Sequence, residues 1–202
     1  MTRVLALKIA FRVCFTLFIL AIIYIISFGS VEEWSVTRNS WLVRSVGYAA
    51  LISFALSFSI TPLNKLTSFF GRKAPQAILL AFRRAFGIGA ACFAIIHAGF
   101  VIYLQLESNW SVFIHLPFFR AGLISLFLLL VLLITSFPAM LKLFRVKYWR
   151  NLHQLVFVIG IMIIQHVWLS AFVPAWVVLA MLISYSILVL LRFIPKVPVK
   201  KK

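Results

Sequence analysis

Acidic residues are almost missing from this chain. It contains no Asp and only three Glu, against 20 Lys and Arg in 202 residues. Glu32, Glu33 and Glu107 all lie outside the long apolar runs. Proton-coupled transporters usually depend on carboxylates inside the membrane, so this scarcity argues against a transporter of that kind.

Cysteine is nearly as scarce. Cys14 and Cys92 are the only two, and both lie within apolar runs. A disulfide framework or a cysteine metal site is therefore not expected. The first apolar run is too long for a secretory signal peptide and lacks a cleavage site of small residues, so we expect it to be retained.

Apolar residues are what the chain has in excess, at 64%. Long runs that are apolar on every side indicate membrane-spanning helices rather than a barrel, whose strands would alternate. We therefore predict an all-α, polytopic membrane protein, with one domain over residues 1–202. Its six spans are expected at about residues 9–28, 42–61, 85–106, 118–138, 152–172 and 175–193. All seven prolines fall at or near these boundaries, where helices commonly end.

The positive charge is unevenly distributed between the loops. The N-terminal segment, the second and fourth loops and the tail hold 17 of the 20 Lys and Arg and no acid. In this assignment Arg83 and Arg84 belong to the second loop. Basic residues concentrate on the cytoplasmic side, so both termini are expected to be cytoplasmic. A net charge of +17 in short loops between apolar spans indicates the lipid bilayer as the partner, and not nucleic acid.

Histidines inside the apolar runs are the main functional signal. The run Leu152–Ser170 carries His153 and His166, and the third span carries His97. His97 lies 13 residues after Arg84, and His166 lies 13 residues after His153. Because a helix rises about 1.5 Å per residue, His97 and His166 both lie ~20 Å from the inner end of their helices, and so at the same depth. Two facing imidazoles can clamp one heme iron and leave no site for oxygen. Alternatively, each only hydrogen-bonds a neighbouring helix.

His153 and Arg84 are predicted to lie together at the inner end. His153 is either an interfacial side chain or a ligand of a second heme. In an ideal helix it lies ~140° away from the face of His166. Either the helix is distorted and the two histidines share a face, or His153 faces a different neighbour. Arg84 stands where a second histidine would lie, and it either pairs with a heme propionate or is only an inner-loop charge. His115, in an outer loop, is expected to be solvated.

A set of short stretches covers about residues 45–170. They are Ile60-Thr61-Pro62-Leu63, Arg83-Arg84 with Gly87 before His97, Pro117 and Gly122, Thr135-Ser136, and Trp149-Arg150-Asn151-Leu152-His153 leading to His166-Val167-Trp168. In order and spacing they resemble the ferric-reductase-like transmembrane domain family, and most closely its bacterial branch of heme-binding membrane subunits (MsrQ type) of the periplasmic protein-methionine-sulfoxide reductase system.

The resemblance implies a b-type heme held by the histidines of the third and fifth spans, and leaves open whether there are one or two hemes. It also implies electrons from the quinone pool or a cytoplasmic flavin reductase, and binding of FMN. The heme-binding core is then about residues 42–172, followed by a basic cytoplasmic tail at 194–202. Arg84 departs from the wider oxidase pattern, which has an inner histidine there.

Three functions fit these features. The leading hypothesis is a heme b electron-transfer subunit in the bacterial inner membrane that serves a periplasmic methionine-sulfoxide reductase catalytic subunit. Seven residues after Pro195 do not suffice for a flavin or nicotinamide domain, so a separate donor is expected. The alternative is a stand-alone metalloreductase that reduces ferric or cupric chelates at its outer face. A third hypothesis is a non-redox membrane protein with structural histidines.

Overall fold

The computed structural model describes residues 36–69, 75–105, 110–137, 139–140, 146–170 and 172–193. The regular elements in this part of the chain are α-helices, as predicted. They are α2 (Val36–Phe69), α3 (Gln76–Gln105), α4 (Trp110–His115), α5 (Pro117–Thr135), α7 (Val146–Leu152), α8 (Leu155–Leu169) and α9 (Ala175–Leu191). The span expected at 9–28, Cys14 and all three Glu lie outside the described residues.

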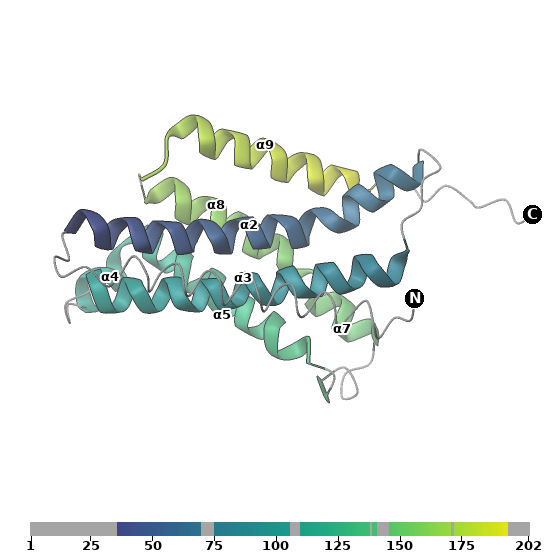
Figure 1. Ribbon diagram of the computed structural model, residues 1–202, viewed down its shortest axis with the longest axis horizontal. Helices are drawn as coiled ribbons and strands as arrows, with labels where there is room; N and C mark the ends of the chain where they lie inside the picture. Colours follow the sequence, from purple (N-terminus) through teal and green to yellow (C-terminus); the bar gives the residue numbers. More distant parts are fainter. Residues whose placement is uncertain are drawn as a thin grey trace, which may run out of the picture.

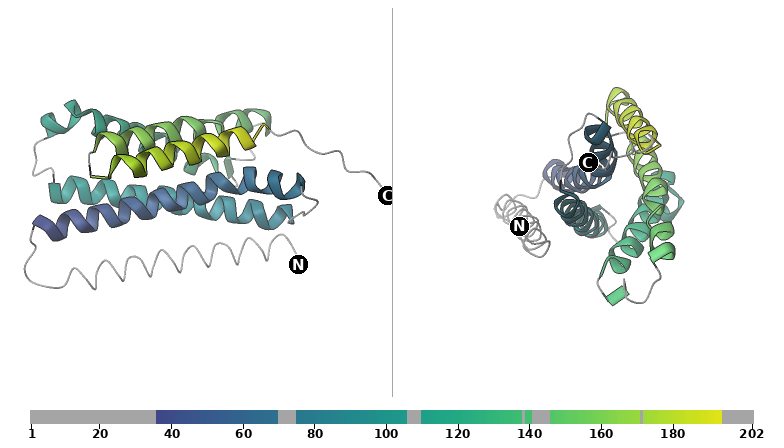
Figure 2. Two further views of the ribbon diagram at one scale, coloured as in Figure 1. Left: turned by 90° about the horizontal axis from the view of Figure 1, so that it is seen from above. Right: turned by 90° about the vertical axis from the view of Figure 1, so that its right-hand side faces the viewer.

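The helices form two hairpins that face each other. α2 and α3 run side by side in opposite directions, and α5 and α8 form a second pair (Figure 1). α9 packs on α2 and α8, and α3 also touches α5 (Figure 2). α3 and α8 therefore run in the same direction on opposite hairpins, which places side chains at matching depths across the bundle from one another.

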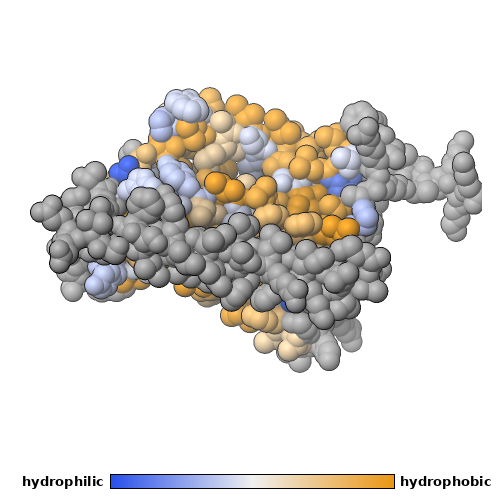
Figure 3. All heavy atoms as spheres, viewed as in Figure 1, coloured by the Kyte–Doolittle hydropathy of each residue, from blue (hydrophilic) through white to orange (hydrophobic). Residues whose placement is uncertain are grey.

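Several of these helices have the length and composition of membrane spans. Four stretches are long and apolar enough to cross a bilayer: Trp41–Thr67, Ile78–Tyr103, Pro117–Thr135 and Lys147–Leu169. α9 is also apolar but shorter. Among the coloured residues of Figure 3, apolar ones predominate, and the most hydrophilic ones lie mainly toward the two ends. A surface of this kind suits a lipid bilayer, whose hydrocarbon core lies between two polar headgroup regions.

The expected start of the third span is wrong. α3 begins at Gln76, so Arg83 and Arg84 lie two turns inside the helix and not in the second loop. Pro75 immediately precedes α3, and the residues that follow are mostly Ala, Leu and Arg, which are good helix formers. Two charged residues interrupt an apolar stretch of sequence, but they do not interrupt a helix. The start of the third span was therefore placed after Arg84 although the helix begins earlier.

Pro62 is a second correction, because it lies inside α2 and not at its end. Proline has no backbone N–H, so the carbonyl of Phe58, four residues earlier, loses its helical partner. The side chain of Arg192, the first residue after α9, donates from Nη2 to this carbonyl at 3.3 Å. The Nζ of Lys65 in turn donates to the carbonyl of Arg192. The end of α9 is thus attached to α2 at its proline.

The centre of the bundle is an apolar cluster of Phe54, Phe58, Ala90, Leu129 and Ile159. Tyr185 of α9 packs on this cluster, and its ring stacks on Phe58 with centroids 5.3 Å apart. Its hydroxyl donates to the carbonyl of Phe157 at 2.7 Å. A phenol inside an apolar bundle needs such an acceptor, so this bond fixes α9 against α8.

Tyr185→Phe should lower the free energy of unfolding by about 1 kcal/mol, because it removes one interhelical hydrogen bond and keeps the ring. The measurement is denaturant unfolding of the purified protein in detergent micelles. Tyr103→Phe is the matched control, since Tyr103 is 81% exposed. Equal effects of the two substitutions would contradict the role given to the Tyr185 hydroxyl.

Candidate functional site

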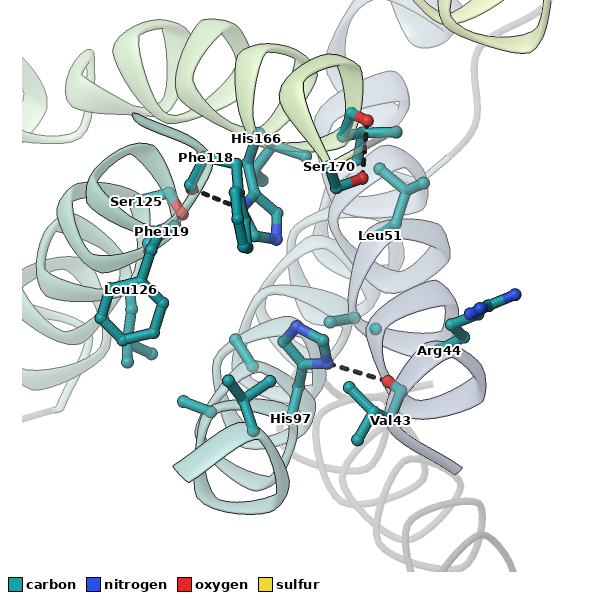
Figure 4. Close-up of a pocket in the computed structure, with 18 of the residues that line it drawn as sticks. Val43, Arg44, Leu51, His97, Phe118, Phe119, Ser125, Leu126, His166 and Ser170 are labelled. Carbon is teal, nitrogen blue, oxygen red and sulfur yellow. Dashed lines mark hydrogen bonds between the residues drawn. The ribbon is translucent and has the colours of Figure 1, made fainter. Parts of the chain in front are cut away.

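His97 and His166 meet across the interior of the bundle. His97 comes from α3 and His166 from α8. Their ring centroids are 6.2 Å apart and the ring planes are nearly perpendicular, at 81°. Figure 4 shows the two rings pointing toward each other across a cavity. The structure therefore brings together the two histidines that their sequence depth had paired.

Each imidazole is held by a backbone carbonyl of the neighbouring helix. His97 Nδ1 lies 2.9 Å from the carbonyl oxygen of Val43, and His166 Nδ1 lies 2.7 Å from that of Phe118 (Figure 4). A carbonyl oxygen can only accept, so the proton of each neutral ring is on Nδ1. The lone pair of each Nε2 is then left for the cavity. Both rings are oriented for ligation without help from a charged group.

A glycine makes room for each of these hydrogen bonds. Val43 is followed four residues later by Gly47, and Phe118 four residues later by Gly122. A Cβ added at Gly122 would lie 2.9 Å from His166 Nδ1, and one added at Gly47 would lie 3.1 Å from His97 Nδ1. In a helix the carbonyl of residue i points toward residue i+4. When residue i+4 is a glycine, no Cβ covers this carbonyl, and a donor from a neighbouring helix can reach it from the side. The same arrangement occurs twice.

The space between the rings, called here the histidine-pair cavity, has a volume of about 200 Å³. Its wall is mainly apolar, with Arg44, Tyr48, Ser125 and Ser170 as its other polar residues. When two imidazoles bind one metal ion from opposite sides, each metal–nitrogen bond is about 2 Å long. Each ring centroid lies roughly 1 Å beyond its nitrogen, so the two centroids are about 6 Å apart. The observed separation of 6.2 Å is close to this value.

His153 lies in a second cavity, called here the arginine cavity, of about 450 Å³. The helix is distorted at this point: the amides of Gln154, Val156 and Phe157 each bond three residues back, not four. Each residue in such tighter turns advances by about 120° and not 100°. The distortion shifts His153 toward the face that carries His166, which was one of the two alternatives left open by the sequence.

Trp149 orients the ring of His153. The Trp149 indole donates from Nε1 to the carbonyl of Thr135, at the end of α5, with a distance of 3.0 Å. Its ring lies against His153, with centroids 4.2 Å apart. His153 Nε2 is buried and has no hydrogen-bond partner among the described residues. A buried nitrogen of this kind is available for a ligand.

Three guanidinium groups line the arginine cavity: Arg83, Arg84 and Arg192. Arg84 therefore lines the same cavity as His153, the residue whose depth it was expected to match. Arg83 Nη1 is 3.4 Å from the hydroxyl of Thr61.

Sequence reasoning missed Arg192, which lies at the end of the sixth expected span and was counted only among the basic residues of the inner side. The one available signal was Pro62, which frees a carbonyl that some donor must satisfy. Nothing in the sequence connects that carbonyl to a residue 134 positions away, at the end of another helix.

The two cavities share part of their walls. Phe54 and Leu129 line both, and both belong to the buried apolar cluster. His115 lines neither cavity and is exposed at the end of α4, as expected. In the described part of the chain no three His, Cys, Asp or Glu side chains gather as a metal-ion site. The candidate site is thus two separate cavities with an apolar partition.

Gly122→Ala and Gly99→Ala should have opposite effects on stability. Replacing glycine in a helix normally stabilises by roughly 0.5–1 kcal/mol. Gly99 has open space at its Cβ position and should show this gain. A methyl group at Gly122 would push against His166 and weaken its bond to Phe118, so we expect a loss of about 1–2 kcal/mol. Denaturant unfolding in detergent measures the stability of both variants. A gain in stability for Gly122→Ala would show that the His166 ring is free to move away from the new methyl group.

Comparison with known proteins places this arrangement in a family. The family described as ferric reductase like transmembrane component matches residues 46–164. Proteins named "Protein-methionine-sulfoxide reductase heme-binding subunit MsrQ" are similar to the chain. The one from Xanthomonas campestris pv. campestris (strain 8004) is 31% identical over 126 residues, or 60% of this chain and 54% of the relative. The one from Ralstonia nicotianae is 26% identical over 146 residues, or 69% and 63%.

The chain spans about half the length of the Xanthomonas relative that it matches. The family match covers more than half of the chain and includes both His97 and His153. Together with the apolar helices, it indicates a multi-pass membrane protein. The chain belongs to the ferric reductase like transmembrane component family.

Proposed function

We propose that this protein is a heme b electron-transfer subunit of a methionine-sulfoxide reductase system. The observation that carries the proposal is the pair of His97 and His166, whose Nδ1 atoms are fixed on backbone carbonyls and whose Nε2 atoms face one cavity. The similarity to proteins named as heme-binding subunits of that system supports the choice of cofactor and partner.

His97 and His166 are the residues that would hold the heme iron. When bound, heme b supplies a one-electron Fe(III)/Fe(II) couple. The backbone carbonyls of Val43 and Phe118 would fix the tautomer and orientation of both ligands and raise the basicity of their Nε2 atoms. With an imidazole on each side, the iron would have no free site for oxygen or substrate, so the site would suit electron transfer. The apolar wall excludes water from the ligands.

We propose the bacterial inner membrane as the location, with six spans and both termini in the cytoplasm. The arginine cavity, with Arg83, Arg84 and Arg192, then lies near the cytoplasmic side, in keeping with the placement of basic residues. The histidine-pair cavity lies toward the periplasm. The proposed donor is the quinone pool or a cytoplasmic flavin reductase. The proposed acceptor is a periplasmic methionine-sulfoxide reductase catalytic subunit, the partner that the names of the relatives imply.

A second heme at the arginine cavity is part of the proposal. His153 offers a buried nitrogen without a partner, and Arg84 in the same wall offers a charge for a propionate. Phe54 and Leu129 would separate the two groups by apolar side chains. FMN, which the family resemblance implies, is assigned to no residue here.

The purified protein should have a low-spin b-type spectrum, with a Soret band that shifts on reduction by dithionite. His97→Ala and His166→Ala should each abolish this signal, because each removes one side of the clamp. His115→Ala, which alters an exposed histidine outside both cavities, is the control and should change nothing. A colourless protein from cells with adequate heme would overturn the proposed function. A full low-spin signal in either variant would overturn the pairing.

The His153→Ala substitution should show whether the protein holds one heme or two. If the arginine cavity holds a heme, this substitution lowers the heme-to-protein ratio by up to one equivalent, or slows reduction by the donor. The spectrum of the His97 and His166 pair should survive, because the two cavities are separated by apolar side chains. Unchanged heme content together with an unchanged reduction rate would mean that the chain holds a single heme.

A further inference from the structure

α9 lies at the edge of the bundle, where it packs on α2 and α8 (Figure 2). Within α9, all of which the structure describes, Val178 is the one buried residue, and apolar side chains such as Ile187 and Leu190 are exposed. Its polar attachments to other helices are toward its end. The Tyr185 hydroxyl bonds to α8, and Arg192, the residue that follows α9, bonds to α2. The position of this end therefore depends on a small number of side chains.

Arg192 forms one side of the arginine cavity. Its guanidinium carbon lies 4.4 Å from the centroid of the Phe58 ring of α2 and 4.6 Å from that of the Phe157 ring of α8. The head group thus lies between these two helices. No residue of α9 itself lines the cavity, in the part of the chain that the structure describes. One side chain therefore closes the cavity on the side of α9.

The inward position of Arg192 is stabilised by three kinds of contact. Two aromatic faces attract the guanidinium. Its Nη2 donates to the carbonyl of Phe58, which lacks a helical partner because of Pro62. The Nζ of Lys65 donates to the backbone carbonyl of Arg192 itself. Together these contacts attach the end of α9 to α2 and hold the cavity closed.

Other features of the same position oppose it. The Nε of Arg192 is buried and has no hydrogen-bond partner among the described residues, which is unfavourable for a donor. Arg83 and Arg84 line the same cavity, so like charges share one space. A long basic side chain at the end of a membrane helix can instead extend to the interface and be hydrated there. Rotation of the Arg192 side chain is enough to move the guanidinium between these two positions.

We propose that Arg192 is a latch of the arginine cavity. In the inward position its guanidinium closes the space between Phe58 and Phe157. When it turns outward, the end of α9 loses its attachment to α2, and an entrance to the cavity opens between α2 and α8. A ligand reaches His153 by this entrance without separation of the two hairpins. The proposal concerns access alone, so it goes beyond the proposed function and does not depend on which ligand the cavity receives.

The test measures how fast a cysteine in the cavity wall reacts with N-ethylmaleimide, a small neutral thiol reagent. Cys14→Ala and Cys92→Ala first remove the native thiols from the full chain. Val156→Cys, on α8, is the reporter for the arginine cavity. Val167→Cys, on the same helix, lines only the histidine-pair cavity and is the matched control reporter. Both valines are half-buried, and mass spectrometry of the purified protein in detergent follows the labelling.

Arg192→Gln should speed the labelling of Val156→Cys by roughly 10-fold, because it removes a hydrogen bond from a charged donor that favours the closed position. The labelling of Val167→Cys should not change. Arg84→Gln is the matched control, because it removes one charge from the same cavity and leaves the contacts of Arg192 in place. It should leave both labelling rates unchanged. Loss of positive charge or of a bound ligand would affect both arginine variants, so a difference between them is due to the latch.

Pro62→Ala tests the latch without any change in α9 or Arg192. Alanine supplies the N–H that bonds to the carbonyl of Phe58, so the bond from Arg192 to this carbonyl becomes weaker. The labelling of Val156→Cys should therefore rise although α2 itself becomes more regular. Far-UV circular dichroism and denaturant unfolding show whether each variant is folded. If Arg192→Gln does not fold, Pro62→Ala decides the question.

Equal labelling rates of Val156→Cys in the parent protein, Arg192→Gln and Pro62→Ala would overturn the proposal. It is also overturned if Arg84→Gln speeds the labelling as much as Arg192→Gln does. A matching rise at Val167→Cys would have the same consequence, because the bundle would then be loosened as a whole. None of these measurements requires a bound heme, so they remain decisive even if the proposed function is wrong.

Discussion

The two hydrogen bonds from imidazole Nδ1 to a backbone carbonyl are the constraint on which the site depends. A helix carbonyl already has a partner four residues on, and the side chain at that position normally covers it. Gly47 and Gly122 remove this cover from Val43 and Phe118, so a ring from the facing helix can reach in. The two hydrogen bonds fix the orientation of both rings and place the proton of each neutral ring on Nδ1. No carboxylate is needed for this, in a chain that has almost none.

The positive charges follow a different rule. Long basic side chains near the ends of membrane helices usually extend toward the interface. Arg192 instead folds back, because Pro62 leaves a carbonyl open in α2 and two aromatic rings surround it. One missing N–H in one helix thus determines where a guanidinium from another helix lies. The arginine cavity is a consequence of this local defect in α2 as much as of the basic composition.

The apolar core between the two cavities links these arrangements. Phe54 and Leu129 contribute to both walls, and Phe58 contacts Arg192 on one side while it stacks on Tyr185 of α9. A change in the packing of this core would therefore be felt at both cavities, since close-packed interiors transmit small displacements. The polar groups of the site are held apart by the same residues that hold the helices together.

Much of the site could be read from residue spacing. Equal separations of 13 residues placed His97 and His166 at one depth, and the structure brings them together. The same reasoning left the face of His153 undecided, because an ideal helix cannot show that its turns tighten at Gln154. It also misplaced Arg83 and Arg84 in a loop, since hydropathy detects where charge begins and not where backbone hydrogen bonds end.

By itself the sequence determined the all-helical class, the apolar spans and the depth of the paired histidines, because these depend on composition and on the constant rise of a helix. Only the tertiary structure decided which carbonyls hold the rings, why two glycines stand beside them, and that Arg192 joins Arg83 and Arg84. Those contacts join helices that are distant in the chain. They depend on helix rotation and local distortion, which no one-dimensional pattern records.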